Sequence, residues 1–412
     1  MSATAVIATS PDALEAHAPA WDQLAAAALE PNVFQESWMA LPGWRAFGTQ
    51  AAIQAVLVYQ GDRLDGVFLL DRVPRLYGLP IPVLRSWTHQ YSPLGTPLVR
   101  ADASSECLDA LFDWLAHQPE GAPVIELVGY ASDGPFQRAL TDCLRRRRLA
   151  RFEAQTFPRA VLRRGRDTAA AASAGGRKEL RRQRRRLEES GRLELRELQA
   201  GADPNPWIRA FLDLERAGWK GRARTALASD PAHQSFFERI AVGAHSRGRL
   251  RLLGLFLDDE PIAMKCNLIA PPGSFAWKIA FDERFARFSP GVQLELDNVA
   301  AFHEEPGLAW MDSCSSEGHA MIERLWADRR AIAVTLCATG RTTTGRLFVS
   351  ALGPLRKLYR RARTMLGPSQ PEGPCVPPRA SLSPRAARRS APSSPAAAET
   401  ARAAPPDPAA RP

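Results

Sequence analysis

Three titratable side chains lie at or near predicted strand ends, where a proton acceptor is chemically useful. Asp282 follows the aromatic and β-branched stretch 274–281, Asp312 lies near the end of a predicted strand over 308–313, and His319 precedes a predicted helix. A carboxylate can take the proton of an attacking amine or hydroxyl, and histidine titrates near neutrality, so each suits general acid–base catalysis. Each also has a structural alternative, a turn cap or a solvated surface group, and the residue types leave both open.

A turn just after the first of these strands has the features of a phosphate seat. Ser289, Pro290 and Gly291 interrupt the chain, and a helical pattern then runs as far as Pro306. A helix that starts after such a turn points unpaired N–H groups and its positive dipole end at that place. A plain structural connection is the alternative. The turn therefore predicts a pyrophosphate site formed by Arg287, Ser289, Gly291, Val292 and Gln293.

Three further residues are candidates for binding the acceptor of a group transfer. Trp219 and Lys220 follow a predicted helix, where a flat aromatic beside a lysine can line a pocket or simply accompany a helix C-cap. Lys278 falls in the middle of the predicted strand, and a buried lysine needs a partner. Glu295 and Asp282 are the expected partners, although two-residue alternation can instead place Lys278 on a solvated face.

Four blocks of the chain resemble the GNAT acyltransferase superfamily and, more narrowly, the bacterial acetyltransferase family associated with cellulose biosynthesis. The resemblance covers about residues 160–335, with blocks at 178–187, 211–227, 278–293 and 311–326. It implies an enzyme that uses acetyl-CoA or another acyl-CoA as co-substrate, with no metal. It also implies direct attack of an amine or hydroxyl on the thioester, with a small molecule, a sugar or a polysaccharide precursor as acceptor.

The turn departs from the superfamily pattern, and two other functions remain open. Between Arg287 and Gly291 there is one extra residue, and the second glycine of the pattern is missing, so the phosphate-facing N–H groups are not identified. An aminoacyl-tRNA-dependent transferase of the peptidoglycan-bridge type would place tRNA on the basic helix predicted over 177–186. That helix has little aromatic interleaving, which disfavours a nucleic-acid partner. A non-catalytic scaffold in exopolysaccharide biosynthesis is the third interpretation.

The order of predicted elements indicates an α/β (α+β) protein of two tandem GNAT-like units, with mixed sheets covered by helices on both faces. Each half shows two helices, a hairpin, a strand and a helix. The first half also predicts a helix that ends before Gly43 and an aromatic strand and loop over 77–93. The expected domains are a degenerate first unit at 1–156, the acyltransferase unit at 157–350, a basic helical extension at 351–366 and a tail at 367–412.

Composition and charge narrow the possible partners and location of the protein. The tail 367–412 holds twelve prolines and twelve alanines and is expected to be disordered, because it cannot bury a core. Residues 356–412 carry +8 of the net charge of +10, so the basic balance does not require a polyanion partner. The six cysteines are scattered without metal-binding spacing, and the N-terminus does not resemble a secretory signal, so we expect a cytoplasmic protein. The sequence has no long apolar run, so we expect no membrane span. The oligomeric state is left open.

Overall fold

The computed structural model describes residues 3–118, 121–165, 174–340 and 342–365. It divides into a unit Met1–Leu358, which carries every feature discussed below, and a unit Tyr359–Pro412. The predicted disordered tail 367–412 lies outside the described residues, whereas α12 (Thr343–Met365) contains most of the predicted basic extension. Within the described part, no helix combines the length and apolar character needed to cross a membrane.

The first half of the larger unit begins with a strand and a group of helices, followed by a hairpin. The helix predicted to end before Gly43 continues to Phe47, so that prediction is wrong. The elements, in chain order, are β1 (Thr4–Ala8), α1 (Pro11–Glu15), α2 (Ala18–Ala26), η1 (Val33–Gln35), α3 (Ser37–Phe47), β2 (Ile53–Gln60), β3 (Arg63–Val73), β4 (Val83–Ser86), β5 (Leu98–Val99), η2 (Ala101–Ala103), α4 (Ser104–His117), β6 (Val124–Ala131), α5 (Pro135–Arg146) and β7 (Arg151–Arg163).

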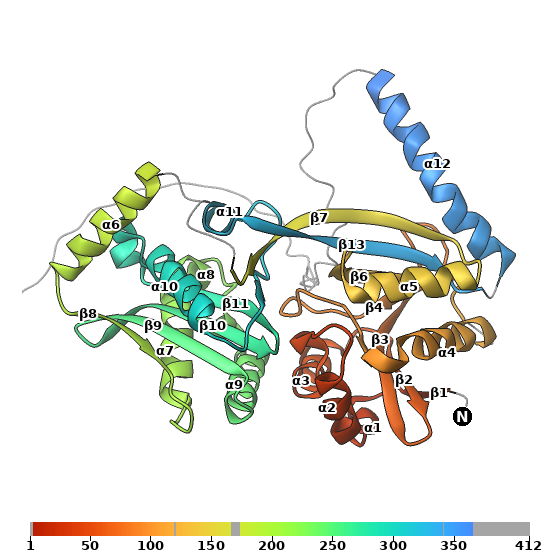
Figure 1. Cartoon of the computed structure of the whole chain (residues 1–412), viewed down its shortest axis with the longest axis horizontal. Helices are drawn as coiled ribbons and strands as arrows, with labels where there is room; N and C mark the ends of the chain where they lie inside the picture. Colours follow the sequence, from red (N-terminus) through yellow and green to blue (C-terminus); the bar gives the residue numbers. More distant parts are fainter. Residues whose placement is uncertain (1–2, 119–120, 166–173, 341, 366–412) are drawn as a thin grey trace, which may run out of the picture. The chain divides into compact units, whose positions relative to one another are not determined.

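From β8 onward, the elements of the second half follow the order of the first, with α6 added in front and no counterpart of β5 (Figure 1). They are α6 (Ala174–Glu188), β8 (Leu193–Glu197), α7 (Asn205–Ala217), α8 (Trp219–Arg222), η4 (Leu227–Ser229), α9 (Pro231–Ser246), β9 (Leu250–Leu257), β10 (Glu260–Ala270), β11 (Gly273–Phe281), η5 (Glu283–Phe288), α10 (Pro290–Glu304), β12 (Trp310–Asp312), α11 (Ala320–Leu325) and β13 (Asp328–Ala338).

The described strands form one mixed sheet of 13 strands. Its order is β1-β2-β3-β4-β6-β13-β7-β12-β11-β10-β9-β8, with β5 attached to β3. The parallel pairs occupy equivalent places in the two halves, β4 with β6 and β11 with β12. The predicted α/β class is confirmed, and the two halves share one sheet.

The final strand of each half belongs to the sheet of the other half. β7, which ends the first half, pairs antiparallel with β12, and β13, which ends the second half, pairs antiparallel with β6. The two exchanged strands also pair with each other from Asp328↔Val161 to Cys337↔Arg151, and Figure 1 shows them running side by side. The sheet of each half is therefore completed by chain from the other.

Helices cover both faces of the sheet, because successive strand residues point to opposite sides. On β9, Leu252 packs in a cluster with Phe211 of α7, while the next residue, Leu253, packs with Leu187 of α6 and Leu294 of α10. In the first half the same alternation places α1 to α3 on one face and α4 and α5 on the other. These helices hold the sheet edges described next.

Candidate functional site

The parallel strands β11 and β12 separate after a short paired stretch. Only Gly273–Phe275 of β11 pairs with β12, opposite Trp310–Asp312, whereas β11 continues to Phe281 along β10. The pairing of β11 with β10 shifts by one residue at Trp277, and such a bulge bends a strand and disrupts the ladder locally. The described strands therefore leave the edge of β11 from Trp277 to Phe281 without a partner on the β12 side.

The turn that follows β11 is held by its own side chains. Asp282 accepts hydrogen bonds from the backbone N–H and the Nε of Arg284, at 2.8 and 2.7 Å. Ser289 has a left-handed backbone (φ 54°) and immediately precedes α10. Its carbonyl oxygen accepts from the N–H groups of Val292 and Gln293, at 2.9 and 3.0 Å. These two predicted phosphate donors are thus engaged in the first helical turn.

The other predicted phosphate-binding residues differ in exposure. Arg287 is exposed, with its guanidinium 4.6 Å from the ring centre of Phe288. Gly291 is buried, and a Cβ there would lie 3.2 Å from a ring carbon of Phe281. The absence of a side chain at Gly291 therefore serves the packing of α10 against β11, and its role towards a phosphate stays a prediction.

The basic helix α6 lies against the beginning of α10. The Gln293 side chain, which is buried, donates to the carbonyl oxygen of Leu180 at 2.9 Å. Arg184 forms an ion pair with Asp297 at 2.9 Å. Burial raises the pKa of that carboxyl group, and the Arg184 hydrogen bond opposes the shift. α6 is therefore fixed beside the predicted pyrophosphate turn, and the Gln293 side chain is used for that contact.

Trp219 and Lys220 connect the turn to the interior of the second half. Trp219 is 55% exposed, and its backbone N–H donates to Glu283 at 2.7 Å. The Lys220 ammonium donates to Glu215 at 2.7 Å, and the second oxygen of this buried carboxylate accepts from the N–H of Leu227. Trp219 is thus available at the surface, whereas Lys220 already has a carboxylate partner.

Lys278 lies on the unpaired part of β11, and its predicted partners are wrong. Glu295 instead accepts from Lys265 at 2.7 Å, in a pair that is fully buried, and Asp282 binds Arg284. The Lys278 ammonium lies 4.1 Å from the ring centre of Tyr91, and no salt bridge to it occurs among the described residues. Burial, reinforced by the charge of Lys220, lowers the pKa of Lys278 to about 8.

The aromatic cluster around Lys278 comes partly from the first half, and its one sequence signal is the aromatic stretch 77–93. The backbone carbonyl of Tyr91 accepts from the Trp277 indole at 2.9 Å, and the Tyr91 hydroxyl contacts His233 of α9 at 3.1 Å. His89 stacks on Phe47 with ring centres 4.9 Å apart. Burial, aided by the charge of Lys278, lowers the pKa of His89 to about 3, so its ring is uncharged at neutral pH.

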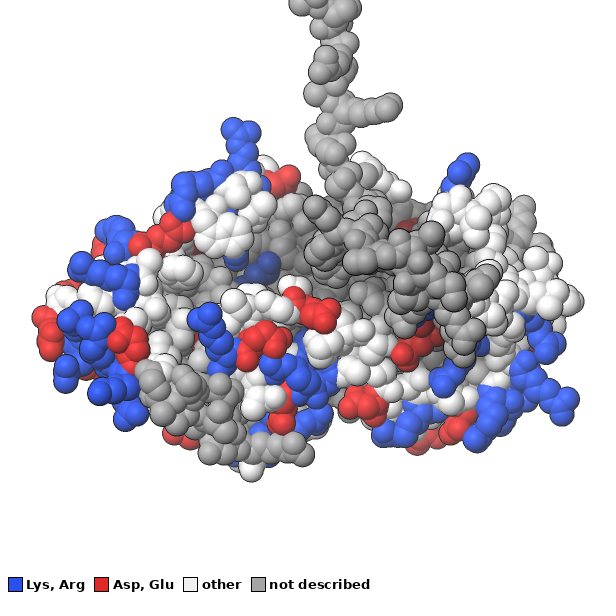
Figure 2. All heavy atoms as spheres, turned by 90° about the horizontal axis from the view of Figure 1, so that it is seen from above, with Lys and Arg blue, Asp and Glu red and all other residues white. Residues whose placement is uncertain are grey.

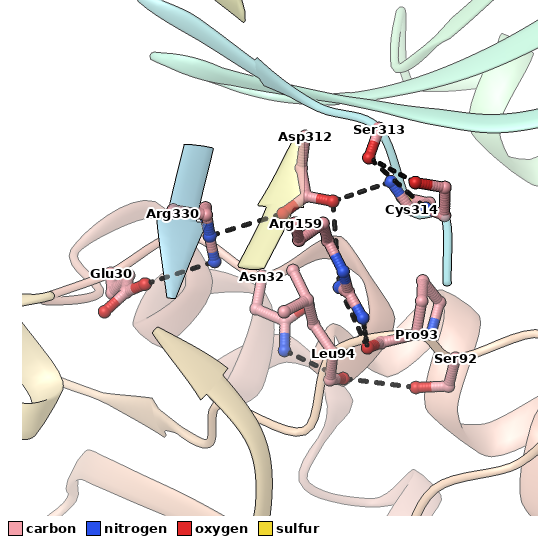
Figure 3. Close-up of polar contacts among 11 residues, drawn as sticks. Glu30, Asn32, Ser92, Pro93, Leu94, Arg159, Asp312, Ser313, Cys314 and Arg330 are labelled. Carbon is pink, nitrogen blue, oxygen red and sulfur yellow. Dashed lines mark hydrogen bonds and ion pairs between the residues drawn. The ribbon is translucent and has the colours of Figure 1, made fainter. Parts of the chain in front are cut away.

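Asp312 lies in a buried charge network where the two halves meet (Figure 3). Its carboxylate is 3.3 Å from Arg330 of β13 and 3.7 Å from Arg159 of β7, and it accepts from the N–H of Cys314 at 2.7 Å. Arg330 also faces Glu30 at 3.8 Å. Two carboxylates and two guanidiniums balance in charge, as buried ions require. This arrangement holds Asp312 in place at the end of β12.

His319, the remaining candidate base, and Cys314 both follow β12 in the chain. His319 is exposed, and its ring accepts weakly from the N–H of Ile322 at 3.5 Å, at the start of α11. Burial, together with Asp312, raises the pKa of the Cys314 thiol well above its usual range, which disfavours a nucleophilic thiolate. In the part of the chain that the structure describes, no group of side chains could hold a metal ion.

The equivalent gap in the first half is closed by its own chain. β4 pairs with β6 only from Val83 to Arg85, but the segment that follows then binds back to β6. Gly95 donates its N–H to the carbonyl of Gly129 at 2.9 Å. A Cβ at Gly95 would lie 2.2 Å from the Val128 carbonyl oxygen, so only glycine allows this approach. Among the described strands, the pairing gap that no backbone hydrogen bond closes is therefore the one between β11 and β12, where Lys220 Nζ lies 3.5 Å from the Ile279 carbonyl oxygen.

Comparison with known proteins agrees with this location. Residues 174–315, from α6 to just beyond β12, match the family described as an acetyltransferase (GNAT) domain. The chain carries a GNAT-superfamily acyltransferase domain. Such a domain makes the chain a transferase enzyme. No protein of curated function matches it in sequence.

Solved structures resemble both halves of this GNAT-containing chain together. FemX has a TM-score of 0.52 at 11% identity, and the match covers 78% of this chain and 95% of FemX. A tandem GNAT protein from the clavulanic acid biosynthesis pathway gives 0.41 at 15%, covering 83% and 100%. The C-terminal domain of a putative lysylphosphatidylglycerol synthetase from Agrobacterium fabrum gives 0.47 at 11%, covering 84% and 96%. The FemX match, which spans both halves, agrees with the predicted fold class.

Proposed function

We propose that the chain transfers an acyl group from acyl-CoA to an amine or hydroxyl, with the donor bound between β11 and β12. The separation of these strands after Phe275 is the observation that carries the proposal. An unpaired strand edge can hydrogen-bond the amides of the pantetheine arm, as an added strand would. The first half offers no equivalent gap, because Gly95 and its neighbours fill it.

The turn between β11 and α10 is the proposed site of the donor pyrophosphate. Arg287 and Ser289 lie on its accessible side, and the helix start adds a positive dipole end. Acetyl-CoA is the first donor to test, and the resemblance to acetyltransferases associated with cellulose biosynthesis favours a sugar or polysaccharide precursor as acceptor. Trp219 and Lys278 are proposed to face the acceptor.

A charge change at Ser289 tests the donor site without endangering the fold. Aspartate tolerates a left-handed backbone and suits a helix start, so Ser289→Asp preserves α10, but its carboxylate repels a pyrophosphate. Ser289→Asn is the matched neutral control. Calorimetric titration with CoA and acetyl-CoA should show at least about tenfold weaker binding for the aspartate variant only. Equal affinity for both variants and the wild type would place the pyrophosphate elsewhere.

An aminoacyl-tRNA donor is the second candidate function. Two observations favour this function. The fold resembles that of FemX at low sequence identity, and the basic helix α6 is held in a fixed position beside α10. On the face seen in Figure 2, however, basic and acidic side chains are interspersed where grey atoms do not cover them. Filter binding with aminoacylated tRNA distinguishes the two donors. If aminoacyl-tRNA is the donor, its binding should fall steeply as the salt concentration rises, and CoA should leave the melting temperature of the protein unchanged.

A further inference from the structure

Lys278 is a titratable group on the strand edge where the proposed donor would lie. It falls three residues after the last β11 residue that pairs with β12. Its ammonium rests on the face of Tyr91. The charged groups that act on it are Lys220 of α8 and Glu215 of α7, and the thiols of Cys266 on β10 and Cys314 just after β12 also face it. His89 belongs to the same aromatic cluster, with its ring centre 6.3 Å from that of Tyr91. Among the described residues, no carboxylate forms a salt bridge with Lys278.

The three residues expected from sequence to act as bases are committed to other contacts. Asp282 receives two hydrogen bonds from Arg284 at the start of η5. Asp312 is fully buried beside two arginines and receives the N–H of Cys314. His319 is exposed at the start of α11. Each has a structural task, whereas Lys278 has none that satisfies its charge.

We propose that Lys278, as the uncharged amine, takes the proton from the attacking group of the acceptor. The inference rests on the proposed acyl transfer and adds the base to it. The acceptor nitrogen or oxygen bonds to the thioester carbon, the carbon–sulfur bond breaks, and the proton moves to Lys278 Nζ. The resulting ammonium then protonates the departing CoA thiolate, which restores the neutral lysine. Reactants and products balance without a further reagent.

The surroundings of Lys278 support this assignment. Burial and the Lys220 charge destabilise the ammonium, and the pKa of about 8 leaves a substantial uncharged fraction near neutral pH. A base acts best when its pKa lies near the working pH. Lys220 keeps Glu215 occupied at 2.7 Å, so that carboxylate is not free to pair with Lys278. The pair Lys220 and Glu215 therefore helps to maintain the neutral amine.

The test measures acetyl-CoA hydrolysis, with water as the acceptor, by thiol release from pH 6 to 10. In the wild type the rate should rise with pH and level off above about pH 8. Lys278→Arg keeps the charge but cannot release a proton, and Lys278→Gln removes the charge. Both should lose the pH-dependent rise and at least about a hundredfold in rate. Rates equal to the wild type in either variant would overturn the proposal.

Two further measurements separate this inference from the proposed function. Calorimetry with CoA should give the same affinity for wild type and both variants, whereas a wild type that fails to bind CoA refutes the donor site itself. The sequence contains only five lysines, so 13C-methyl labelling gives few NMR signals. The signal missing in Lys278→Arg should titrate near pH 8, and titration near the ordinary lysine value of 10.5 would overturn the role as base without any turnover assay.

Discussion

Replacing Lys278 by methionine should stabilise the protein, although it removes the proposed base. The pKa of Lys278 falls from 10.5 to about 8 in the folded chain. At 1.36 kcal/mol per pKa unit, the partly buried ammonium costs about 3 kcal/mol at pH 7. Methionine keeps the apolar stem against the Tyr91 ring, but it loses a cation–π contact of about 0.5–1 kcal/mol. We expect a net gain of about 2 kcal/mol in the free energy of unfolding.

This gain in the free energy of unfolding should decrease as the pH rises. Because the folded-state pKa lies below the unfolded one, the unfolded chain binds more protons between pH 8 and 10.5, and wild-type stability rises there. The advantage of Lys278→Met should therefore be complete below about pH 8, shrink as pH rises, and vanish above about pH 10.5. Urea unfolding followed by tryptophan fluorescence at pH 7, 9 and 10.5 measures it.

Lys220→Met is the matched control for this experiment. Lys220 is paired with Glu215 at 2.7 Å, so its loss takes an ion-pair partner from a buried carboxylate, which keeps the Leu227 N–H and can then interact with Lys278. We expect a loss of about 1–3 kcal/mol at pH 7. If Lys278→Met is destabilised like this control, and equally at every pH, then Lys278 bears no burial strain and the reasoning about its ammonium is wrong.

Three other substitutions follow from the buried contacts. Glu295→Gln should cost about 3–5 kcal/mol in urea unfolding, because the buried Lys265 ammonium loses its carboxylate at 2.7 Å. Asp312→Asn should cost about 3 kcal/mol, and a variant that melts like the wild type but loses turnover would instead make Asp312 catalytic. Gly95→Val should lower the melting temperature by several degrees while CoA affinity is unchanged, because its Cβ would lie 2.2 Å from the Val128 carbonyl oxygen; weaker CoA binding would implicate the first half.

Local patterns predicted local structure well. The hairpin β2–β3, the start of α10 after Ser289 and the basic helix α6 all follow from propensity, turn chemistry and spacing. Gly43 misled the prediction, because glycine usually weakens a helix. In the structure a Cβ at this position would lie 2.7 Å from His89 Nε2, so the glycine makes room for that ring. The side chain that requires a glycine here is therefore 46 residues further along the chain.

The candidate site depends on contacts that no local pattern contains. The two-residue alternation of side chains along a strand could not decide which lysine binds Glu295. In the structure the bulge at Trp277 places Lys278 away from Glu295, and Lys265 faces this carboxylate instead. Of the partners of Asp312, Arg330 on β13 follows 18 residues later, whereas Arg159 on β7 lies 153 residues earlier in the chain. Tyr91 reaches the second half through a loop whose aromatic content was visible but whose direction was not. Pairings of this kind are set by tertiary structure.

The exchange of β7 and β13 has a consequence for synthesis on the ribosome. β6 ends at Ala131, and β13, its partner, begins only at Asp328, roughly 200 residues later. At roughly 5–20 residues per second, the first half waits about 10–40 s for the strand that completes its sheet. During this interval the β6 edge offers unpaired N–H and C=O groups to any neighbouring nascent chain. The growing polypeptide, rather than the finished protein, is the stage at which misassociation and chaperone binding are expected.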